Sequence, residues 1–309
     1  MRLNRFVVVA ANALLLCLSF SSHAAVVENR TWQVADNVYR FGAAAGNNGY
    51  YSMFIVTEEG VIAIEPVNSQ HSADLMQAIR AVTDQPVRYL LHSHNHWDHS
   101  KGGKVFREAG ATIMAHGDAV EWMKAYPHPD MVLPDKQWSG DRFDINLGAT
   151  TVELHHIGIS HGLGMTVFVL KEQKMAYIAD LVAPDRVLFA TVPDFNIKEW
   201  LRALSEIERL DFDSAIFSHT QSPKPLGSKK DVTLTREFIG DIQQAIVAEF
   251  KKGTNFVNIP DAIDLPKYKH WAMYEEWLPL NAWRIMLEMH MGPYPWLPTR
   301  AFDHQTLVH

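Results

Sequence analysis

The stretch Leu91-His92-Ser93-His94-Asn95-His96-Trp97-Asp98-His99-Ser100-Lys101-Gly102-Gly103 decides the fold. Its four histidines and one aspartate directly follow the apolar run Val87-Arg88-Tyr89-Leu90-Leu91. That run, entered by Pro86, predicts a buried strand that ends at the histidine cluster. Neutral imidazole is the commonest metal ligand in proteins, and carboxylates complete a site that suits zinc. The stretch therefore predicts a metal site at the end of a strand.

The spacing of these residues indicates how the ligands divide. In an extended segment His94 and His96 point the same way and Asp98 can follow them, whereas His99 points elsewhere and can reach a second metal. The alternative is a histidine-rich surface tract that binds metal only adventitiously. The glycine pair, the preceding strand and the isolated His and Asp residues downstream favour a built site.

The motif His94-Asn95-His96-Trp97-Asp98-His99 resembles the HxHxDH signature of the metallo-β-lactamase superfamily, including the glycine pair that often follows it. The resemblance extends from about residue 38 to residue 220. It implies an α/β fold, a four-layer αββα sandwich. The C-terminal ninety residues lie outside the resemblance and read as a helical extension.

The remaining ligands implied by the resemblance lie downstream. His161, in the loop Gly158-Ile159-Ser160-His161-Gly162-Leu163-Gly164, resembles the third histidine motif of the family, with His155 and His156 in the preceding strand as alternatives. Asp180 follows the strand 175–178 at the family's GD position, where Ala179 replaces glycine and a helix N-cap is the alternative role. His219 follows the strand 215–217, where the family often has PGH.

Carried over by residue, the resemblance assigns His94, His96 and His161 to one metal, Asp98, His99 and His219 to a second, and Asp180 to both. It implies two Zn²⁺ per chain, with iron or manganese as alternatives. Glu65 stands where the family usually has an aspartate that supports the site. For the histidines at 92, 116 and 156, we expect at most a role in orienting ligands through the far ring nitrogen.

The implied function is that of a dinuclear zinc hydrolase, in which a metal-bridging hydroxide attacks the substrate and Asp98 shuttles the proton. The expected substrate is a small molecule with an ester, lactone or lactam bond. A phosphodiesterase or sulfatase on the same metal site is one alternative. A non-catalytic, exported zinc-binding protein is another.

The N-terminus predicts export. Arg2 and Arg5 precede an apolar segment at residues 6–20, and Ser22-His23-Ala24 supplies small residues for cleavage after Ala24. A transmembrane anchor is the alternative, but this apolar segment is short for a span. We therefore expect a periplasmic or secreted protein with no stable membrane anchor after cleavage. Cys17, the only cysteine, lies in this segment, so the exported chain would have neither a disulfide nor a thiolate ligand.

Composition is typical of a globular protein, with 309 residues of which 47% are hydrophobic and 20% charged. The formal net charge of −7 argues against a nucleic-acid partner. We expect a hydrolase domain at residues 25–225, with a helical extension at 226–309 packed on it that offers an oligomer contact. The predicted helices cover residues 72–83 with Ser72 as N-cap, 197–210, 233–252 and 271–290, with a linker at 260–266.

Overall fold

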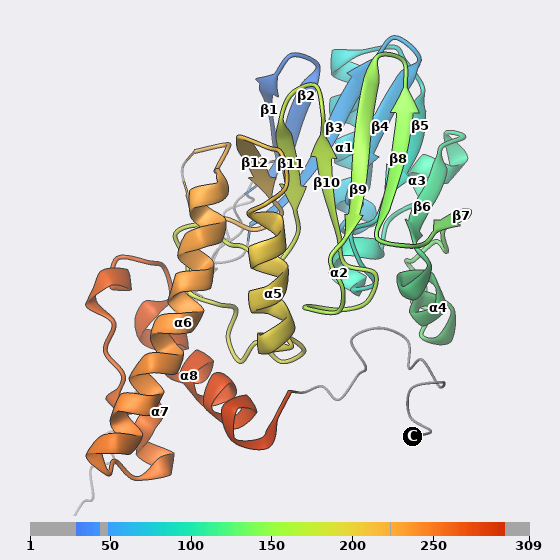
Figure 1. Ribbon diagram of the computed structural model, residues 1–309. Helices are drawn as coiled ribbons and strands as arrows, with labels where there is room; N and C mark the ends of the chain where they lie inside the picture. The colour runs from blue at the N-terminus through green and yellow to red at the C-terminus, as the bar shows by residue number, and fades with distance from the viewer. Residues whose placement is uncertain (1–28, 44–48, 223, 294–309) are drawn as a thin grey trace, which may run out of the picture.

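The computed structural model describes residues 29–43, 49–222 and 224–293 of the chain (Figure 1). The predicted signal peptide at residues 1–24 lies outside them. Within the described residues, no helix has the length and apolar character needed to cross a membrane.

Two β-sheets form the centre of the molecule. The first has seven strands in chain order: β1 (Arg30–Ala35), β2 (Val38–Ala43), β3 (Tyr50–Thr57), β4 (Gly60–Ile64), β5 (Val87–Leu91), β6 (Thr112–His116) and β7 (Lys136–Trp138). It is antiparallel from β1 to β4 and parallel from β4 to β7. The short strand β7 follows the loop at residues 126–135, which comes after α4 (Gly117–Ala125).

The second sheet has five strands in the order β12-β11-β10-β9-β8. They are β8 (Arg142–Leu147), β9 (Thr150–His156), β10 (Thr166–Leu170), β11 (Met175–Ile178) and β12 (Ser214–Phe217). Neighbours are antiparallel except β11 and β12, which run parallel. As a result β9, β11 and β12 all end at the same edge of the sheet.

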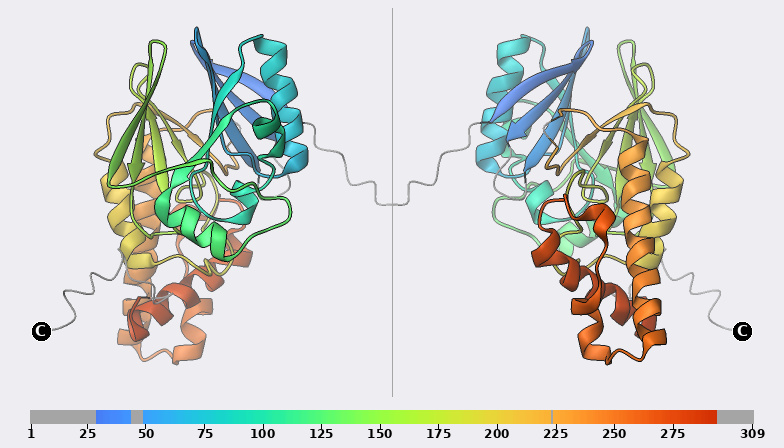
Figure 2. Two further views of the ribbon diagram at one scale, coloured as in Figure 1. Left: turned by 90° about the vertical axis from the view of Figure 1, so that its right-hand side faces the viewer. Right: turned by 90° about the vertical axis from the view of Figure 1, so that its left-hand side faces the viewer.

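Helices cover the outer face of each sheet (Figure 2). Helices α1 (Ser69–Val82) and α3 (Lys104–Glu108) lie against the first sheet, and α5 (Ile197–Ile207) and α6 (Lys229–Lys252) lie on the side of the second. Side chains alternate accordingly along β3, where Met53 and Ile55 face the core between the sheets and Phe54 faces α1. The predicted αββα sandwich is confirmed.

The start of α1 differs from the prediction. Asn68, not Ser72, is the N-cap, and its side chain accepts a hydrogen bond from the backbone N–H of His71 at 2.9 Å. Ser72 lies buried inside the helix and donates to the carbonyl of Pro66. Both residue types cap helices, so their order in the sequence did not identify the true start.

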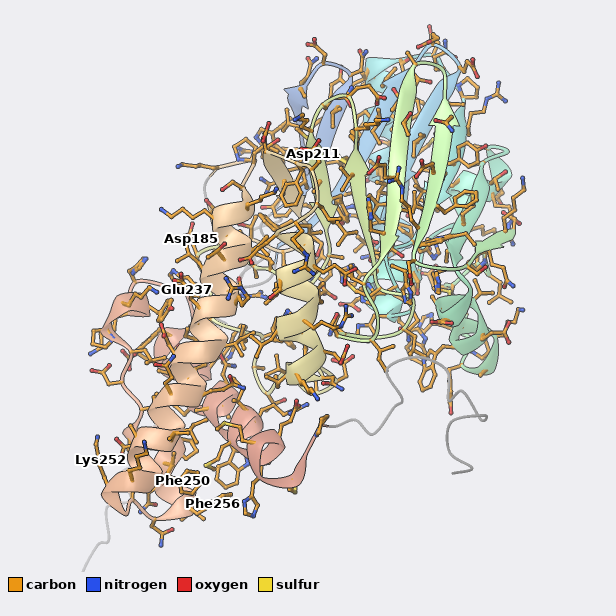
Figure 3. The ribbon with its side chains drawn as sticks, viewed as in Figure 1. Asp185, Asp211, Glu237, Phe250, Lys252 and Phe256 are labelled. Atoms are coloured by element: carbon orange, nitrogen blue, oxygen red, sulfur yellow. The ribbon has the colours of Figure 1, made fainter. Side chains whose placement is uncertain are left out.

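The starts of the C-terminal helices also differ from the prediction: α6 begins before residue 233, and α8 begins after residue 271. Helix α6 starts at Lys229 because Ser228 and Asp231 form a capping box, and it ends at Gly253 in a left-handed conformation. The expected linker at 260–266 overlaps the short helix α7 (Ile259–Ala262), since proline is compatible with the first turn of a helix. Helix α8 (Tyr274–Met291) then packs on α6 and shares its core with α5. Phe250 and Phe256 lie close together at the far end of α6 (Figure 3).

Candidate metal centre

Strand direction explains why residues far apart in the sequence meet at one edge. The predicted metal-binding residues follow the C-terminal ends of β5, β9, β11 and β12. Backbone hydrogen bonds join the two sheets there, from Thr166 N–H to the Ser93 carbonyl at 2.8 Å and from Tyr51 N–H to the Ser218 carbonyl at 2.9 Å. The loops that leave these strands therefore converge, and each delivers a polar side chain at a place where the sheet's own hydrogen bonds end.

All seven predicted site residues lie together, in two groups whose donor atoms are within 4.8 Å of one another inside each group. The first group contains His94, His96, His161 and Asp180, and the second contains Asp98, His99 and His219. This division is the one that the resemblance implies.

Asp180 joins the two groups. Its Oδ2 lies 3.2 Å from His94 Nε2 and 2.8 Å from His161 Nε2, while its Oδ1 lies 3.2 Å from His99 Nε2 and 2.7 Å from His219 Nε2. The backbone of Asp180 has φ 53°, a left-handed conformation that aspartate tolerates better than most residues. The turn at the end of β11 therefore orients the carboxylate between the groups.

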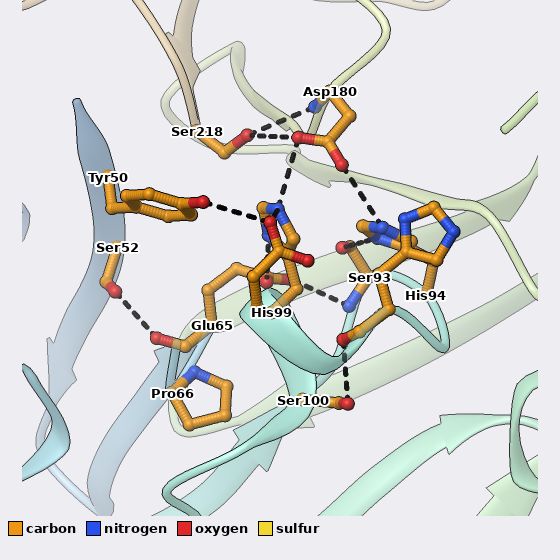
Figure 4. A network of polar contacts seen from close by, with 12 residues as sticks. Tyr50, Ser52, Glu65, Pro66, Ser93, His94, His99, Ser100, Asp180 and Ser218 are labelled. Atoms are coloured by element: carbon orange, nitrogen blue, oxygen red, sulfur yellow. Dashed lines mark hydrogen bonds and ion pairs between the residues drawn. The ribbon is translucent and has the colours of Figure 1, made fainter. Parts of the chain in front are cut away.

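Glu65 supports this arrangement from behind (Figure 4). Its side chain is fully buried; one carboxylate oxygen accepts the Ser93 N–H at 2.7 Å and the other lies 2.8 Å from His99 Nδ1. His219 is held in the same way, with its Nδ1 2.7 Å from the carbonyl of Gly49. These contacts fix which ring nitrogen of each histidine faces Asp180.

The donor set fits a pair of divalent cations. Imidazole and carboxylate are ligands for zinc and similar ions. Gly162 keeps the first group open, because a Cβ at this position would lie 3.0 Å from His94 Cδ2 and 3.1 Å from His96 Nε2. Asp180 lies among the four buried imidazoles of His94, His99, His161 and His219. A side chain at position 162 would reduce the space in the first group.

Electrostatics favour an ionised Asp180 and a protonated His161 when no metal is bound. Burial raises the pKa of Asp180, but His99, His219 and His161 outweigh it and hold that pKa well below its usual value. Burial lowers the pKa of His161, but Asp194 and Asp180 raise it to about 9. Burial and the neighbouring His96 lower the pKa of His94 to about 3, so that ring is neutral. A cation at the first group must therefore displace a proton from His161.

Asp194 is a site residue that the sequence did not reveal. Its Oδ2 lies 2.7 Å from His96 Nε2 and its Oδ1 lies 3.2 Å from His161 Nδ1. It belongs to no motif, and only its place in the loop Val192-Pro193-Asp194-Phe195, shortly after Asp180, is a signal. Tyr50 is a second such residue, with its hydroxyl donating to Asp98 Oδ2 at 3.0 Å.

The two groups open into a cavity of about 340 Å³. Besides site residues, it is lined by Tyr50 and by five residues of the segment 186–195, namely Arg186, Phe189, Pro193, Asp194 and Phe195. Phe195 stacks on His161 with ring centroids 3.9 Å apart. We call residues 186–195 the cavity wall. The candidate metal ligands thus form one side of the cavity, and the cavity wall adds the aromatic rings of Phe189 and Phe195 to the other.

Helix α8 holds the cavity wall in place. Asn281 Nδ2 donates to the carbonyls of Leu188 and Ala190 at 3.1 and 2.7 Å, and Arg284 donates to the carbonyl of Phe195. The buried Glu288 pairs with Arg284 and accepts the first N–H groups of α5, from Ile197 and Lys198. The C-terminal extension therefore supports one wall of the cavity.

Other predicted candidates lie elsewhere. His155 faces Glu153 at 3.1 Å, in keeping with a position inside β9. His116 and His156, for which we expected at most a role in orienting ligands, stack on each other beside Trp138. His116 ends β6 and His156 ends β9, the strand whose following loop carries His161.

Comparison with known proteins agrees with this geometry. The profile of the metallo-beta-lactamase superfamily matches residues 45–219, more than half of the chain, and the chain belongs to this superfamily. It carries candidate binding groups for divalent metal at the expected edge of the sandwich.

The chain is similar to both subunits of an O-demethylase. It is 27% identical over 197 residues to the 2,4-dinitroanisole O-demethylase subunit alpha of Nocardioides sp. (strain JS1661), covering 62% of this chain and 56% of that one. It is 25% identical over 167 residues to subunit beta, covering 53% and 51%. The chain thus spans about half the length of these relatives. The solved metallo-beta-lactamase from Pontibacter korlensis matches 68% of this chain and 98% of its own, with a TM-score of 0.59 and 17% identity, and shows the shared fold.

Proposed function

We propose that this protein is an exported hydrolase that uses two zinc ions to cleave an ester, lactone or lactam bond in a small molecule. One observation carries the proposal: Asp180 presents one oxygen to His94 and His161 and the other to His99 and His219. A carboxylate shared by two groups of imidazoles is an arrangement that suits a pair of cations.

Within this proposal His94, His96 and His161 would hold the first ion, Asp98, His99 and His219 would hold the second, and Asp180 would serve both. Bound zinc supplies Lewis acidity, which lowers the pKa of water and polarises the bond to be broken. Asp98, half exposed to the cavity, takes up and returns the proton. Tyr50 orients Asp98 through its hydroxyl hydrogen bond.

A second candidate is the cleavage of an activated aryl methyl ether to a phenol and methanol. The similarity to two O-demethylase subunits favours it. So does the cavity, because Tyr50, Phe189 and Phe195 offer aromatic surface to a flat ring. The same metal site would serve either reaction.

Metal content and turnover test the proposal together. The purified protein, without residues 1–24, would be analysed for bound metal and assayed with nitrocefin, nitrophenyl acetate, a lactone, bis-nitrophenyl phosphate, nitrophenyl sulfate and 2,4-dinitroanisole. We expect at least two zinc equivalents and one dominant activity among the first three substrates. Dominant turnover of 2,4-dinitroanisole would favour the ether reaction instead. No turnover after zinc reconstitution would contradict a hydrolase and support a binding protein.

Export is tested separately. The full chain would be expressed in a bacterial host, and the periplasmic, secreted and cytoplasmic fractions compared by mass. We expect a chain that starts at Ala25 outside the cytoplasm. An uncleaved chain in the cytoplasm would contradict the signal peptide.

A further inference from the structure

A third cluster of metal-binding residues lies apart from the two groups already described. His116 is the last residue of β6 and His156 the last of β9, and both are buried, with 4% and 7% exposure. Asp118 lies in the first turn of α4 (Gly117–Ala125) with its side chain half exposed. The two imidazoles come from different sheets, and they face each other because β6 and β9 end at the same edge (Figure 1).

The three side chains converge on a small volume. Asp118 Oδ2 lies 3.6 Å from His116 Nδ1 and 3.8 Å from His156 Nε2, and one donor atom of each residue lies within 4.8 Å of the others. Ligands at about 2.1 Å from a tetrahedral zinc ion are separated by about 3.4 Å. The two separations from Asp118 Oδ2 are therefore only slightly longer than the edge of a zinc tetrahedron.

The local environment favours the form of histidine that binds metal. Burial lowers the pKa of His116 despite the nearby Asp118, which leaves its imidazole neutral at neutral pH. Its Nδ1 accepts the Asp118 N–H at 3.3 Å, so the lone pair is directed toward the start of α4. Trp138 closes the other side, with its ring edge-on to His116 at 4.7 Å.

We propose that His116, Asp118 and His156 form a third binding site for a divalent cation of the zinc type, separate from the catalytic pair. The two imidazole rings are stacked, with centroids 3.8 Å apart and 14° between their planes, so they must rotate out of the stack until both lone pairs point at one ion. The ion must also replace the Asp118 N–H as the partner of His116 Nδ1. Water takes the fourth position, since Asp118 is accessible to solvent. The ion links the first sheet, through β6, to the second, through β9.

Counting metal equivalents tests the site without reference to catalysis. The protein would be stripped with a chelator, titrated with Zn²⁺ and analysed by mass spectrometry of the native protein, alongside Asp118→Asn and His156→Gln. We expect both variants to bind one equivalent fewer than the unaltered protein. His155→Gln is the matched control, because His155 neighbours His156 but pairs with Glu153, and it should keep every equivalent.

Thermal unfolding supplies a second measurement. An ion that binds only the folded state raises Tm, so zinc should raise the Tm of the unaltered protein more than that of Asp118→Asn. Asp118 is half exposed, which keeps the test valid if His156→Gln fails to fold. Turnover should be the same in Asp118→Asn and the unaltered protein. Equal stoichiometry in the unaltered protein, Asp118→Asn and His155→Gln would overturn the proposal.

Discussion

The metal centre and the cavity wall line the same cavity but are held in place by different parts of the chain. The metal centre consists of residues at strand ends, supported by buried contacts such as that between Glu65 and His99. The cavity wall is a loop segment that depends on side chains of α8, about ninety residues later. The sandwich itself therefore positions the candidate metal ligands. The shape of the opposite side of the cavity depends on the C-terminal extension.

The largest effect should come from removing the residue shared by both groups. We expect Asp180→Asn to lose metal and to lower kcat by more than about 100-fold, because even a supporting partner of a ligand is typically worth about 10–100-fold. Metal analysis and steady-state kinetics measure this. His155→Gln is the control. Normal metal content and normal kcat in Asp180→Asn would show that Asp180 is not a residue of the metal centre.

The zinc affinity of the metal centre should depend on pH, which the cavity wall gives no reason to expect. Below pH 9 a cation must displace the proton from His161, whose pKa is about 9 without metal. Zinc affinity should therefore rise by up to about tenfold per pH unit from pH 6.5 to 9 and then level off. Competition with a chromophoric chelator at each pH measures this, and an affinity independent of pH would be inconsistent with a protonated His161.

The same group should make the metal-free protein less stable in alkali. The folded-state pKa of His161 lies above the ordinary value of about 6.5, so its contribution to stability is complete below that pH and is lost as pH rises through about 9. The Tm of chelator-treated protein should fall over this range more than that of zinc-loaded protein. Parallel Tm profiles would count against this assignment.

Glu65→Gln should weaken the metal centre but leave the wall intact. The substitution removes the negative charge beside His99 Nδ1, and we expect metal affinity to fall about 10–100-fold. At saturating zinc, KM should stay near its original value. Glu121→Gln, at an exposed position on α4, is the control; unchanged zinc affinity in Glu65→Gln would show that the contact does not support the centre.

The smallest effect should follow from a substitution that weakens the support of the cavity wall. It should change KM and leave metal content unchanged, the reverse of the result expected for Glu65→Gln. Glu288→Gln weakens the pairing with Arg284 and the cap on α5, and it should lower kcat/KM about tenfold, mainly through KM, with metal content unchanged. The control is Glu276→Gln, exposed in the first turn of α8. Loss of metal in Glu288→Gln would show that wall and centre are not separable.

Much of the metal centre was accessible from the sequence because its ligands carry local signals. The cluster at 94–99, the glycine-rich loop around His161 and Asp180 after a strand each indicate a position at a sheet edge. Asp194 carries no such signal, since a single acid in a proline-containing loop is indistinguishable from a solvated one. The predicted starts of α1 and α6 were wrong for a similar reason. Asn68 and Ser228 cap these helices, although other nearby residues were equally suited to do so.

The histidine motif, a property of a short segment, was enough to indicate the superfamily, and the resemblance then implied the αββα class and the candidate metal-binding residues. The packing of the folded chain was needed to show that α8 supports the cavity wall, that Asp194 meets His96, and that His116 and His156 stack. These contacts join residues that are far apart in the sequence. The side chains that make them have several potential partners. Their selection depends on how the sheets and helices pack, which no local pattern encodes.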